Sequence, residues 1–256
     1  MLARIESADN NKLKLVRKLA NKKTRDEEGK FVVEGFNLVE EAVNKNADID
    51  YILISDDCDA SRLANLRNSE IPLYEVPEVL FNRLTDAENG VGVVAVVRKT
   101  KNALCVDADK NVLVLDRVQD PGNIGTMIRT AVAAGYGSII AIKGTADLYS
   151  AKVLRATAGM IFDIPLLCVD DAAELRAVLE QSKHRIAVTV PTGGRAYYEE
   201  YLKTGIALVI GNEGNGISQE LLEIADVKLT IPMCGDIESL NAAVSAAILM
   251  YETIRS

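Results

Sequence analysis

Two kinds of hydrophobic pattern take turns along this chain of 256 residues. Short, almost unbroken apolar runs, such as IALVIG at 206–211, are typical of strands in a parallel sheet that is covered on both faces. Between these runs, apolar residues recur every three or four positions, as in FNLVEEAVNKNA at 36–47, and this spacing predicts amphipathic helices. The alternation of the two patterns predicts an α/β protein.

The first hundred residues hold one such series. Residues 11–22 place apolar side chains at helical spacing among lysines, which predicts a first helix. Further along, strands are expected at 31–35, 51–55, 72–76 and 91–99, and helices at 36–47, 60–68 and 77–84. We therefore predict an α/β domain over residues 1–99 and a linker over 100–110, where the periodicity weakens.

A second series fills the rest of the chain and predicts a larger domain over 111–256. Strands are expected at 112–118, 138–143, 165–169, 185–190, 206–211 and 227–232. Helices are expected at 123–135, 150–159, 171–181, 218–225 and 238–255. With 48 % apolar residues, the chain has enough hydrophobic side chains for sizeable cores.

Charge is distributed unevenly along the chain. The net charge is −8, which argues against a uniformly basic nucleic-acid module. Residues 1–30 contain nine basic and five acidic residues, so they carry +4 and the remaining chain carries −12. Seven of the basic residues lie between Asn10 and Arg25, with no acid among them. Such a basic arm suits contact with phosphate, although a solvated helix face explains the run as well.

The cysteines and the histidine argue against a metal site. The four cysteines are far apart and form no CxxC pair, and there is a single histidine, His184. Scattered cysteines indicate reduced core residues of a cytoplasmic protein (Cys58, Cys105, Cys168 and Cys234). His184, flanked by Lys183 and Arg185, is expected at the surface. No signal-peptide pattern opens the sequence, and no apolar run reaches the ~20 residues that cross a membrane.

Three strand-end segments contain the candidate chemistry. LDRVQDPGNIGTMIRTAVAAG at 115–135 ends a buried strand in a turn, begins a helix at Asn123 and carries Arg129 on that helix. LVIGNEGNGIS at 208–218 alternates glycines with polar residues that include Glu213. IPMCGDIESLNAAVSAAILMYE at 231–252 ends another strand and begins a helix of small residues between Glu238 and Asn241. Ligands of α/β proteins bind at such strand ends, so the three segments could converge on one pocket.

Each segment also has a plainer interpretation. The first could be an ordinary βα turn with a surface arginine, although free N–H groups at a helix start favour an anion. The second could be a hairpin-like turn. It has no Walker lysine and no dinucleotide fingerprint in register, and Glu213 makes it a poor phosphate cradle. Its glycines let a backbone approach a ligand closely, so a neutral or cationic ligand fits better.

With the three segments in this order and spacing, the chain resembles the SPOUT-class RNA methyltransferases of the TrmH family over essentially its whole length. The resemblance implies S-adenosylmethionine-dependent methylation of a ribose 2′-hydroxyl, by a homodimer. It implies a C-terminal trefoil-knotted SPOUT parallel-sheet domain, preceded by a smaller α/β RNA-binding domain that resembles ribosomal proteins. The layout is most similar to bacterial enzymes that act on 23S rRNA, with guanosine favoured as the target.

The resemblance also implies roles for particular residues. Catalytic or substrate-positioning roles fall on Asn123, Arg129, Glu213 and Asn241. Contacts to S-adenosylmethionine fall on Val190, Gly193, Gly211, Gly214, Ile231, Met233 and Leu240. RNA contacts fall on Lys12, Lys14, Arg17, Lys18, Lys22, Lys23, Arg25 and Glu34. Because a guanidinium is effectively always protonated, Arg129 is expected to grip a phosphate or to stabilise the developing alkoxide rather than to act as a base.

One departure from the family pattern bears on proton transfer. Many relatives have a serine where this chain has Ala243, so a serine-assisted path would depend on Ser239 or Ser245. The missing serine favours, as an alternative, a non-catalytic RNA-binding relative that acts in ribosome assembly. A tRNA 2′-O-methyltransferase is a second alternative, because the sequence does not identify the RNA target. A nucleotide-binding metabolic enzyme that uses GNEGNG is a further alternative, disfavoured by the missing Walker lysine.

Overall fold

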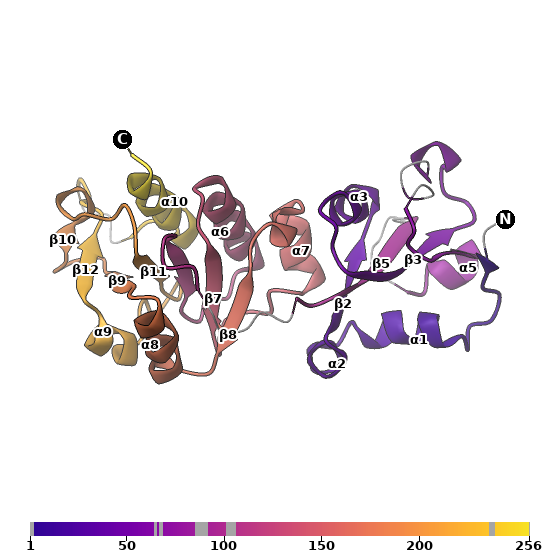
Figure 1. The fold of residues 1–256 in the computed structure, drawn as a ribbon, viewed down its shortest axis with the longest axis horizontal. Coiled ribbons are helices and arrows are strands. Elements are labelled where there is room, and N and C mark those ends of the chain that lie inside the picture. Colours follow the sequence, from indigo (N-terminus) through magenta and orange to yellow (C-terminus); the bar gives the residue numbers. More distant parts are fainter. Residues whose placement is uncertain are drawn as a thin grey trace. The chain divides into compact units, whose positions relative to one another are not determined.

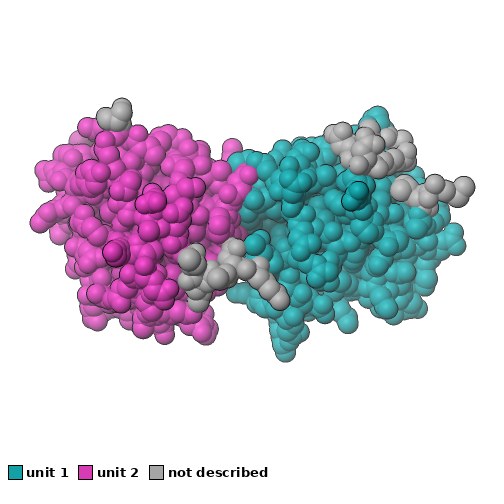
Figure 2. Space-filling model, in the orientation of Figure 1, with its two compact units in different colours: residues 1–100, 149–162 teal, residues 101–148, 163–256 magenta. Residues whose placement is uncertain are grey.

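The computed structural model describes residues 3–63, 66, 69–84, 92–100, 106–235 and 239–255. The chain divides into two compact units, coloured separately in Figure 2. Unit 1 contains residues 1–100 and 149–162, and unit 2 contains residues 101–148 and 163–256. Each unit is built around its own sheet, as the two hydrophobic series predict.

Unit 1 is an α/β unit with a mixed sheet of five strands in the order β1-β4-β3-β5-β2. The strands are β1 Ala3–Arg4, β2 Lys30–Glu34, β3 Ile49–Ser55, β4 Leu73–Val76 and β5 Val93–Arg98. The helices are α1 Asn11–Lys18, α2 Lys22–Glu28, α3 Phe36–Asn44, α5 Glu78–Phe81 and α7 Ala151–Thr157, with 3-10 turns η1 Ala60–Leu63 and η2 Met160–Phe162. Part of the helix expected at 60–68, and residues 101–105 of the expected linker, lie outside the described residues.

The two faces of this sheet are covered by different helices. Leu13 and Val16 of α1 pack with Leu53 of β3 and Val96 of β5. Successive side chains of a strand point to opposite faces, so Ile52, next to Leu53, faces the other side of the sheet. Helix α3 contacts β2 and β5 on that side. The basic helices α1 and α2 and the helix α3 are therefore separate parts of the surface of unit 1.

The helix expected at 11–22 is two helices. Asn10 caps α1 by accepting from the N–H of Lys12, and Asn21 caps α2 by accepting from the N–H of Lys23, both at 2.8 Å. Arg25 donates to the carbonyl oxygens of Leu19 and Ala20 at 2.5 and 2.7 Å. These bonds pair two carbonyl oxygens just after α1 that have no partner within that helix, and they stabilise the turn between α1 and α2.

Unit 2 is built around seven parallel strands in the order β10-β12-β9-β11-β6-β7-β8. The strands are β6 Val112–Leu115, β7 Ser138–Ile142, β8 Leu166–Val169, β9 Arg185–Thr189, β10 Arg195–Ala196, β11 Ile206–Ile210 and β12 Val227–Thr230. The helices are α6 Pro121–Ala133, α8 Ala172–Gln181, α9 Gln219–Ile224 and α10 Ala242–Thr253, with a 3-10 turn η3 Tyr197–Glu199. β6, β7 and β11 are buried along their whole length, as their apolar runs predict.

Helices cover both faces of this sheet. α6 and α10 lie on one face and α8 and α9 on the other (Figure 1), and α6 packs against α10. Buried Ala243 and Ala246 give α10 the close approach expected of its small residues. β11 and β7 flank β6 on opposite sides, so the sheet is extended in both directions from the first strand of the unit. The carboxyl ends of β6 and β11 therefore lie beside each other, at a position where α/β proteins bind ligands.

The segment 149–162 lies within the second hydrophobic series and is grouped by its contacts with unit 1, where the Phe31 and Tyr149 rings lie 4.7 Å apart. One expectation about a single residue is wrong. His184 is buried rather than exposed. Its Nδ1 pairs with Ser182 Oγ at 2.8 Å and its Nε2 with the carbonyl oxygen of Lys110 at 2.7 Å.

The cysteines also differ from the expectation of core residues. Cys58 is half-buried, whereas Cys168 and Cys234 are exposed. In β8, Cys168 lies between buried Leu167 and Val169, so the alternation of the strand turns its side chain outward. Cys105 lies outside the described residues.

Candidate active site

The first strand-end segment turns sharply before it enters α6. Asp116 follows β6 and is buried, and Arg117 adopts a positive φ of 57°. Asp120 caps α6 by accepting from the N–H of Asn123 at 2.7 Å, and Pro121 occupies the first turn. The helix thus begins at Pro121, two residues before the predicted start. Asn123 lies inside its first turn and not at its boundary.

The second segment is a closed turn at the end of β11. Asn212 and Gly216 exchange two backbone hydrogen bonds, of 3.0 and 2.9 Å. The sequence analysis gave a hairpin-like turn and a ligand-binding loop as alternatives. The segment is a hairpin-like turn, and this does not prevent it from contacting a ligand. Closure leaves no room for a side chain at Gly211, because a Cβ there would lie 2.5 Å from the Gly216 oxygen and 2.7 Å from the Ile217 nitrogen. The missing side chain of Gly211 is therefore what allows the turn to close against the end of β11.

Glu213 joins the second segment to the first. Its carboxylate accepts from the backbone N–H groups of Gln119 and Asp120, each at 3.0 Å, and from the Asn123 side-chain amide at 3.1 Å. Partial burial raises the pKa of Glu213, but the hydrogen bonds from Gln119, Asn123 and Asp120 together outweigh it and hold the pKa below its ordinary value. Glu213 therefore stays negatively charged at neutral pH.

The third segment joins the same group through Asn241. Its Oδ1 accepts from the N–H groups of Ala243 and Val244 at 2.9 and 3.2 Å, so Asn241 is the N-cap of α10. Its Nδ2 donates to the Asn123 Oδ1 at 2.9 Å. Helix α10 thus begins at Ala242, not between 238 and 241, and Glu238 lies outside the described residues. Glu213, Asn123 and Asn241, from three segments far apart in the sequence, form one hydrogen-bonded chain.

A cavity of about 530 Å³ lies beside this chain of side chains. Six of the seven residues that the resemblance assigns to the cofactor line it (Val190, Gly211, Gly214, Ile231, Met233 and Leu240). Ser239 and Ser245, the two serines considered for proton transfer, line it as well. Gly193 does not. At φ 77° it turns the chain into β10 beside β12, and it lines a separate, polar hollow with Arg195 and Glu200.

Comparison with known proteins identifies the family. The SpoU rRNA Methylase family matches residues 110–251, and an MRM3-like substrate binding domain matches residues 10–95. The chain belongs to the SpoU rRNA methylase family. This confirms the resemblance to TrmH-family methyltransferases, which rested on the three strand-end segments.

Individual relatives cover nearly the whole chain. The 23S rRNA (guanosine(2553)-2′-O)-methyltransferase RlmP of Bacillus subtilis is 37 % identical over 98 % of each chain. The SpoU methyltransferase AviRb of Streptomyces viridochromogenes, in complex with the cofactor AdoMet, superposes with a TM-score of 0.87 at 27 % identity, over 96 % of this chain and 97 % of that one. An AdoMet-bound rRNA methyltransferase of Sinorhizobium meliloti gives a TM-score of 0.84 at 30 % identity, over 98 % and 97 %.

Arg129 stands apart from the site in this SpoU family member. It lies on α6 six residues after Asn123, about 9 Å further along the helix axis. Six residues also rotate it by about 120° around the helix relative to Asn123. Its side chain is exposed and is not among the residues that line the cavity. Within one protomer, the arginine is therefore not brought to the hydrogen-bonded chain.

The predicted RNA-binding residues differ in their partners. Lys18, Lys22 and Lys23 are exposed on α1 and α2, and Lys23 lies 3.8 Å from the Glu27 carboxylate. The others have contacts within unit 1: Lys12 lies over the Tyr51 and Tyr74 rings, Lys14 pairs with Asp9, Arg17 donates to the Ala8 carbonyl, and Glu34 pairs with Arg155. Arg25 is 7 % exposed and holds the turn between α1 and α2, so we remove it from the phosphate-binding set.

Three residues that the sequence did not single out hold the segments together. Asn212 donates to the Arg117 carbonyl at 2.8 Å and accepts from the N–H groups of Gly214 and Asn215. Asp116 accepts from the N–H of Ser218 at 2.7 Å. Gln119 donates to the Arg117 carbonyl and supplies one N–H to Glu213. Two features of the sequence could have pointed to them: Asp116 is an acidic residue at the end of an apolar strand, and Asn212 is an asparagine in a glycine-containing turn.

The described residues contain no group of three or more His, Cys, Asp or Glu residues that could hold a metal ion. None of their helices is long and apolar enough to cross a membrane.

Proposed function

We propose that this protein transfers a methyl group from S-adenosylmethionine to the ribose 2′-hydroxyl of a guanosine in 23S rRNA, in the cytoplasm. The observation that carries the proposal is the chain Glu213–Asn123–Asn241 at a cavity lined by six of the seven expected cofactor residues. The substrate is taken from RlmP of Bacillus subtilis, which is similar over nearly the full length.

The residues of the cavity fit S-adenosylmethionine. The volume of about 530 Å³ lies within the usual range for small-ligand sites. Gly211, Ile231 and Leu240 line the cavity together, so an adenosyl group would lie against a glycine backbone and two apolar side chains. The charged carboxylate of Glu213 favours a cationic ligand over a phosphate. When bound, the cofactor supplies a methyl group on a positively charged sulfur.

The protein's own contribution is to hold the ribose in place. Because Asn123 and Asn241 are hydrogen-bonded to each other and to Glu213, their amides are fixed before the RNA arrives, and positioning supplies much of the rate of such a reaction. The 2′-hydroxyl must lose its proton as its oxygen bonds to the methyl carbon and the sulfur–carbon bond breaks. Ala243 cannot take part, whereas Ser239 and Ser245 line the cavity and are the proposed hydroxyl relay, in which a serine accepts this proton as it passes its own to solvent water.

The active form in this proposal is a homodimer. α10 exposes Val244, Tyr251 and Ile254, which are 48, 51 and 49 % exposed, and we propose that a second copy covers them. α6, which carries the exposed Arg129, packs against α10, and we propose that this arginine reaches the site of the partner subunit. There it would grip the target phosphate or stabilise the developing alkoxide.

Two finer features of the fold also belong to the proposal. The C-terminal segment would thread a trefoil knot, which is supported by the return of α10 from the β12 side of the sheet to α6 and β11. The domains would be residues 1–99, resembling ribosomal proteins, and 111–256, joined by a linker at 100–110. The two family matches, at 10–95 and 110–251, are consistent with those boundaries.

Calorimetry and methylation mapping test the proposed function together. We expect the purified protein to bind S-adenosylmethionine and to methylate one ribose in 23S rRNA from cells that lack it. A protein that binds the cofactor but methylates only transfer RNA would replace the substrate. Absence of cofactor binding would indicate the non-catalytic relative instead.

A further inference from the structure

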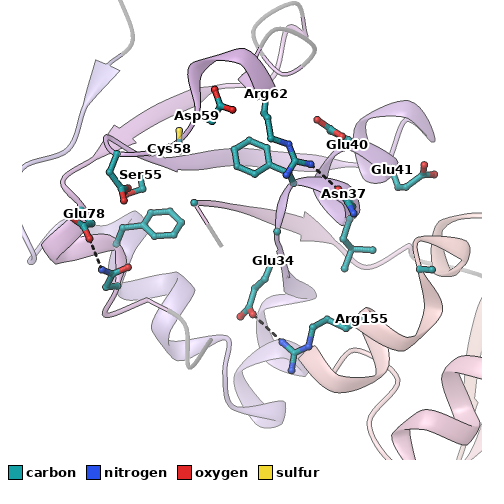
Figure 3. Close-up of a pocket in the computed structure, with 18 of the residues that line it drawn as sticks. Glu34, Asn37, Glu40, Glu41, Ser55, Cys58, Asp59, Arg62, Glu78 and Arg155 are labelled. Atoms are coloured by element: carbon teal, nitrogen blue, oxygen red, sulfur yellow. Dashed lines mark hydrogen bonds and ion pairs between the residues drawn. The ribbon is translucent and has the colours of Figure 1, made fainter. Parts of the chain in front are cut away.

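Unit 1 contains a cavity that the methyl transfer does not use. It measures about 1430 Å³ and lies among the first turn of α3, the end of β3, η1 and α5 (Figure 3). Phe36 and Phe81, both buried, contribute apolar surface to it. The space is above the usual range for a small-molecule site and is large enough for a nucleotide.

One wall of the cavity contains a planar cation beside an aromatic ring. The guanidinium carbon of Arg62 lies 4.5 Å from the centre of the Phe36 ring. Its Nη2 donates to the Asn37 Oδ1 at 2.8 Å, and this contact is drawn in Figure 3. Arg62 lines the cavity together with Phe36 and Asn37, so the guanidinium is held in place where a ligand in the cavity can contact it. Arginine planes held in this way are surfaces on which unpaired RNA bases stack.

The rest of the wall is rich in hydrogen-bond acceptors. Asp57 accepts from the hydroxyl of Ser55, and Asp59 accepts from the N–H of Ser61 at 2.9 Å, so both carboxylates are held in place. Glu78 lines the cavity with them. Carboxylates repel phosphate but accept hydrogen bonds from the N–H groups of a base. Guanine is the RNA base with two adjacent donors, N1–H and the N2 amino group, on its Watson–Crick edge.

We propose that this cavity binds an unpaired guanine of the substrate RNA, stacked on Arg62 and read by the carboxylates of Asp57 and Asp59. The inference rests on the proposed function, since it takes RNA as the substrate, and it adds a base-recognition site distinct from the methylated nucleotide. It also separates two tasks in unit 1. The exposed lysines of α1 and α2 hold phosphate, and the cavity on the α3 side specifies a base.

The test is binding of fluorescein-labelled pentanucleotides to the full-length protein, measured by anisotropy. We expect r(UUGUU) to bind about fivefold more tightly than r(UUAUU), with the inosine analogue, which lacks the N2 amino group, between them. Arg62→Ala and Arg62→Lys should both lose about fivefold or more in affinity for r(UUGUU), because lysine keeps the charge but not the plane. Arg83→Ala, an exposed arginine of the same unit outside the cavity, is the matched control.

A second variant tests the reading of the base. Asp57→Asn keeps the shape of the side chain but changes one acceptor to a donor, so it should abolish the preference for guanine over adenine and leave stacking in place. Equal affinities for the three oligonucleotides, no binding of any of them, or an Arg62→Lys protein equal to wild type would each overturn the inference. A lysine-rich peptide that binds tightly and displaces r(UUGUU) equally well from wild type and from the Arg62 variants would also overturn the inference, because the acidic cavity would then be a peptide site.

Cofactor calorimetry keeps this result distinct from the proposed function. All variants in unit 1 should bind S-adenosylmethionine as wild type does. If the cofactor binds and guanine is not preferred, only the inference fails. If guanine is preferred and no cofactor binds, only the proposed function fails.

Discussion

The cavity beside Glu213 in unit 2 and the cavity of unit 1 are lined in different ways. The cavity of unit 2 is lined by strand-end segments that include Gly211, Gly214 and Gly216, and the turn packs so closely on Gly211 that no side chain fits there. The cavity of unit 1 is lined by side chains, among them the stacked guanidinium of Arg62 and the carboxylates of Asp57 and Asp59. A site formed by glycines and turns within short segments can be recognised in the sequence as a contiguous motif. A site made of side chains depends on which residues meet in space, and it leaves none.

The largest expected effect is that of a methyl group at Gly211. Gly211→Ala would place a carbon 2.5 Å from the Gly216 oxygen, and we expect S-adenosylmethionine affinity to fall about 10- to 100-fold, the range for overpacking a tight site. Gly205→Ala is the control, since Gly205 lies in the same unit outside the cavity and an added carbon there meets nothing within 4 Å, although its φ of 67° is also strained for alanine. Calorimetry on the two variants compares them. Equal affinities would mean that unit 2 does not use its main chain as proposed.

A smaller effect is expected when only the donor of Asn241 is removed. Asn241→Asp keeps the oxygen that caps α10 but turns the group that donates to Asn123 into a second acceptor. We expect the methylation rate to fall about tenfold, which corresponds to one hydrogen bond lost beside a repelling oxygen. The melting temperature should stay near that of wild type. Asn241→Ala, which removes the cap as well, should lower stability by about 1 kcal/mol in addition.

The phosphate contacts of unit 1 should respond to charge rather than to shape. Reversing the charges of Lys18, Lys22 and Lys23 together should weaken RNA binding about fivefold and flatten its salt dependence by about two to three in the logarithmic slope. Reversal of Lys110, Lys152 and Lys203, which are exposed outside the basic arm, is the control. An unchanged salt slope in the first variant would show that α1 and α2 do not carry the phosphate contacts.

The smallest effect concerns the charge of Glu213. Because its pKa is lowered in the folded state, the carboxylate stabilises the fold above its ordinary pKa of 4.5, and this stabilisation is lost as pH falls through the lower, folded value. We expect Glu213→Gln to reduce the free energy of unfolding in urea by less than about 1 kcal/mol at neutral pH, since solvent screens this exposed group. The difference from wild type should shrink below pH 4.5. A difference that grows with acidity would contradict the assigned hydrogen bonds.

Much of the fold followed from local pattern. The runs at 112–115 and 206–210 are buried strands of a parallel sheet, as expected, because helices cover both faces of such a sheet and every side chain of a central strand is then apolar. Elements whose ends depend on a neighbour were harder to predict. The break between α1 and α2 requires Arg25 to reach back to Leu19, and the start of α10 requires Asn241 to turn toward Ala243 and Val244.

The candidate site divides in the same way. Glu213, Asn123 and Asn241 were found from their segments, and their hydrogen bonds unite them. The separation of Gly193 and Arg129 from the cavity depends on the turn into β10 and on helical rotation, which spacing alone does not resolve. The buried place of His184 depends on Ser182 and a carbonyl 74 residues away.

The amino-acid sequence by itself determined the order of strands and helices, the two series and the three strand-end segments, because each depends on residues close together in the chain. Only the tertiary structure decided which of those segments touch, which charged side chains are buried or exposed, and where a second cavity opens. The physical reason is range. Propensity and periodicity act over a few residues, whereas a hydrogen bond between Asn123 and Asn241 exists only after a sheet has brought distant strand ends together.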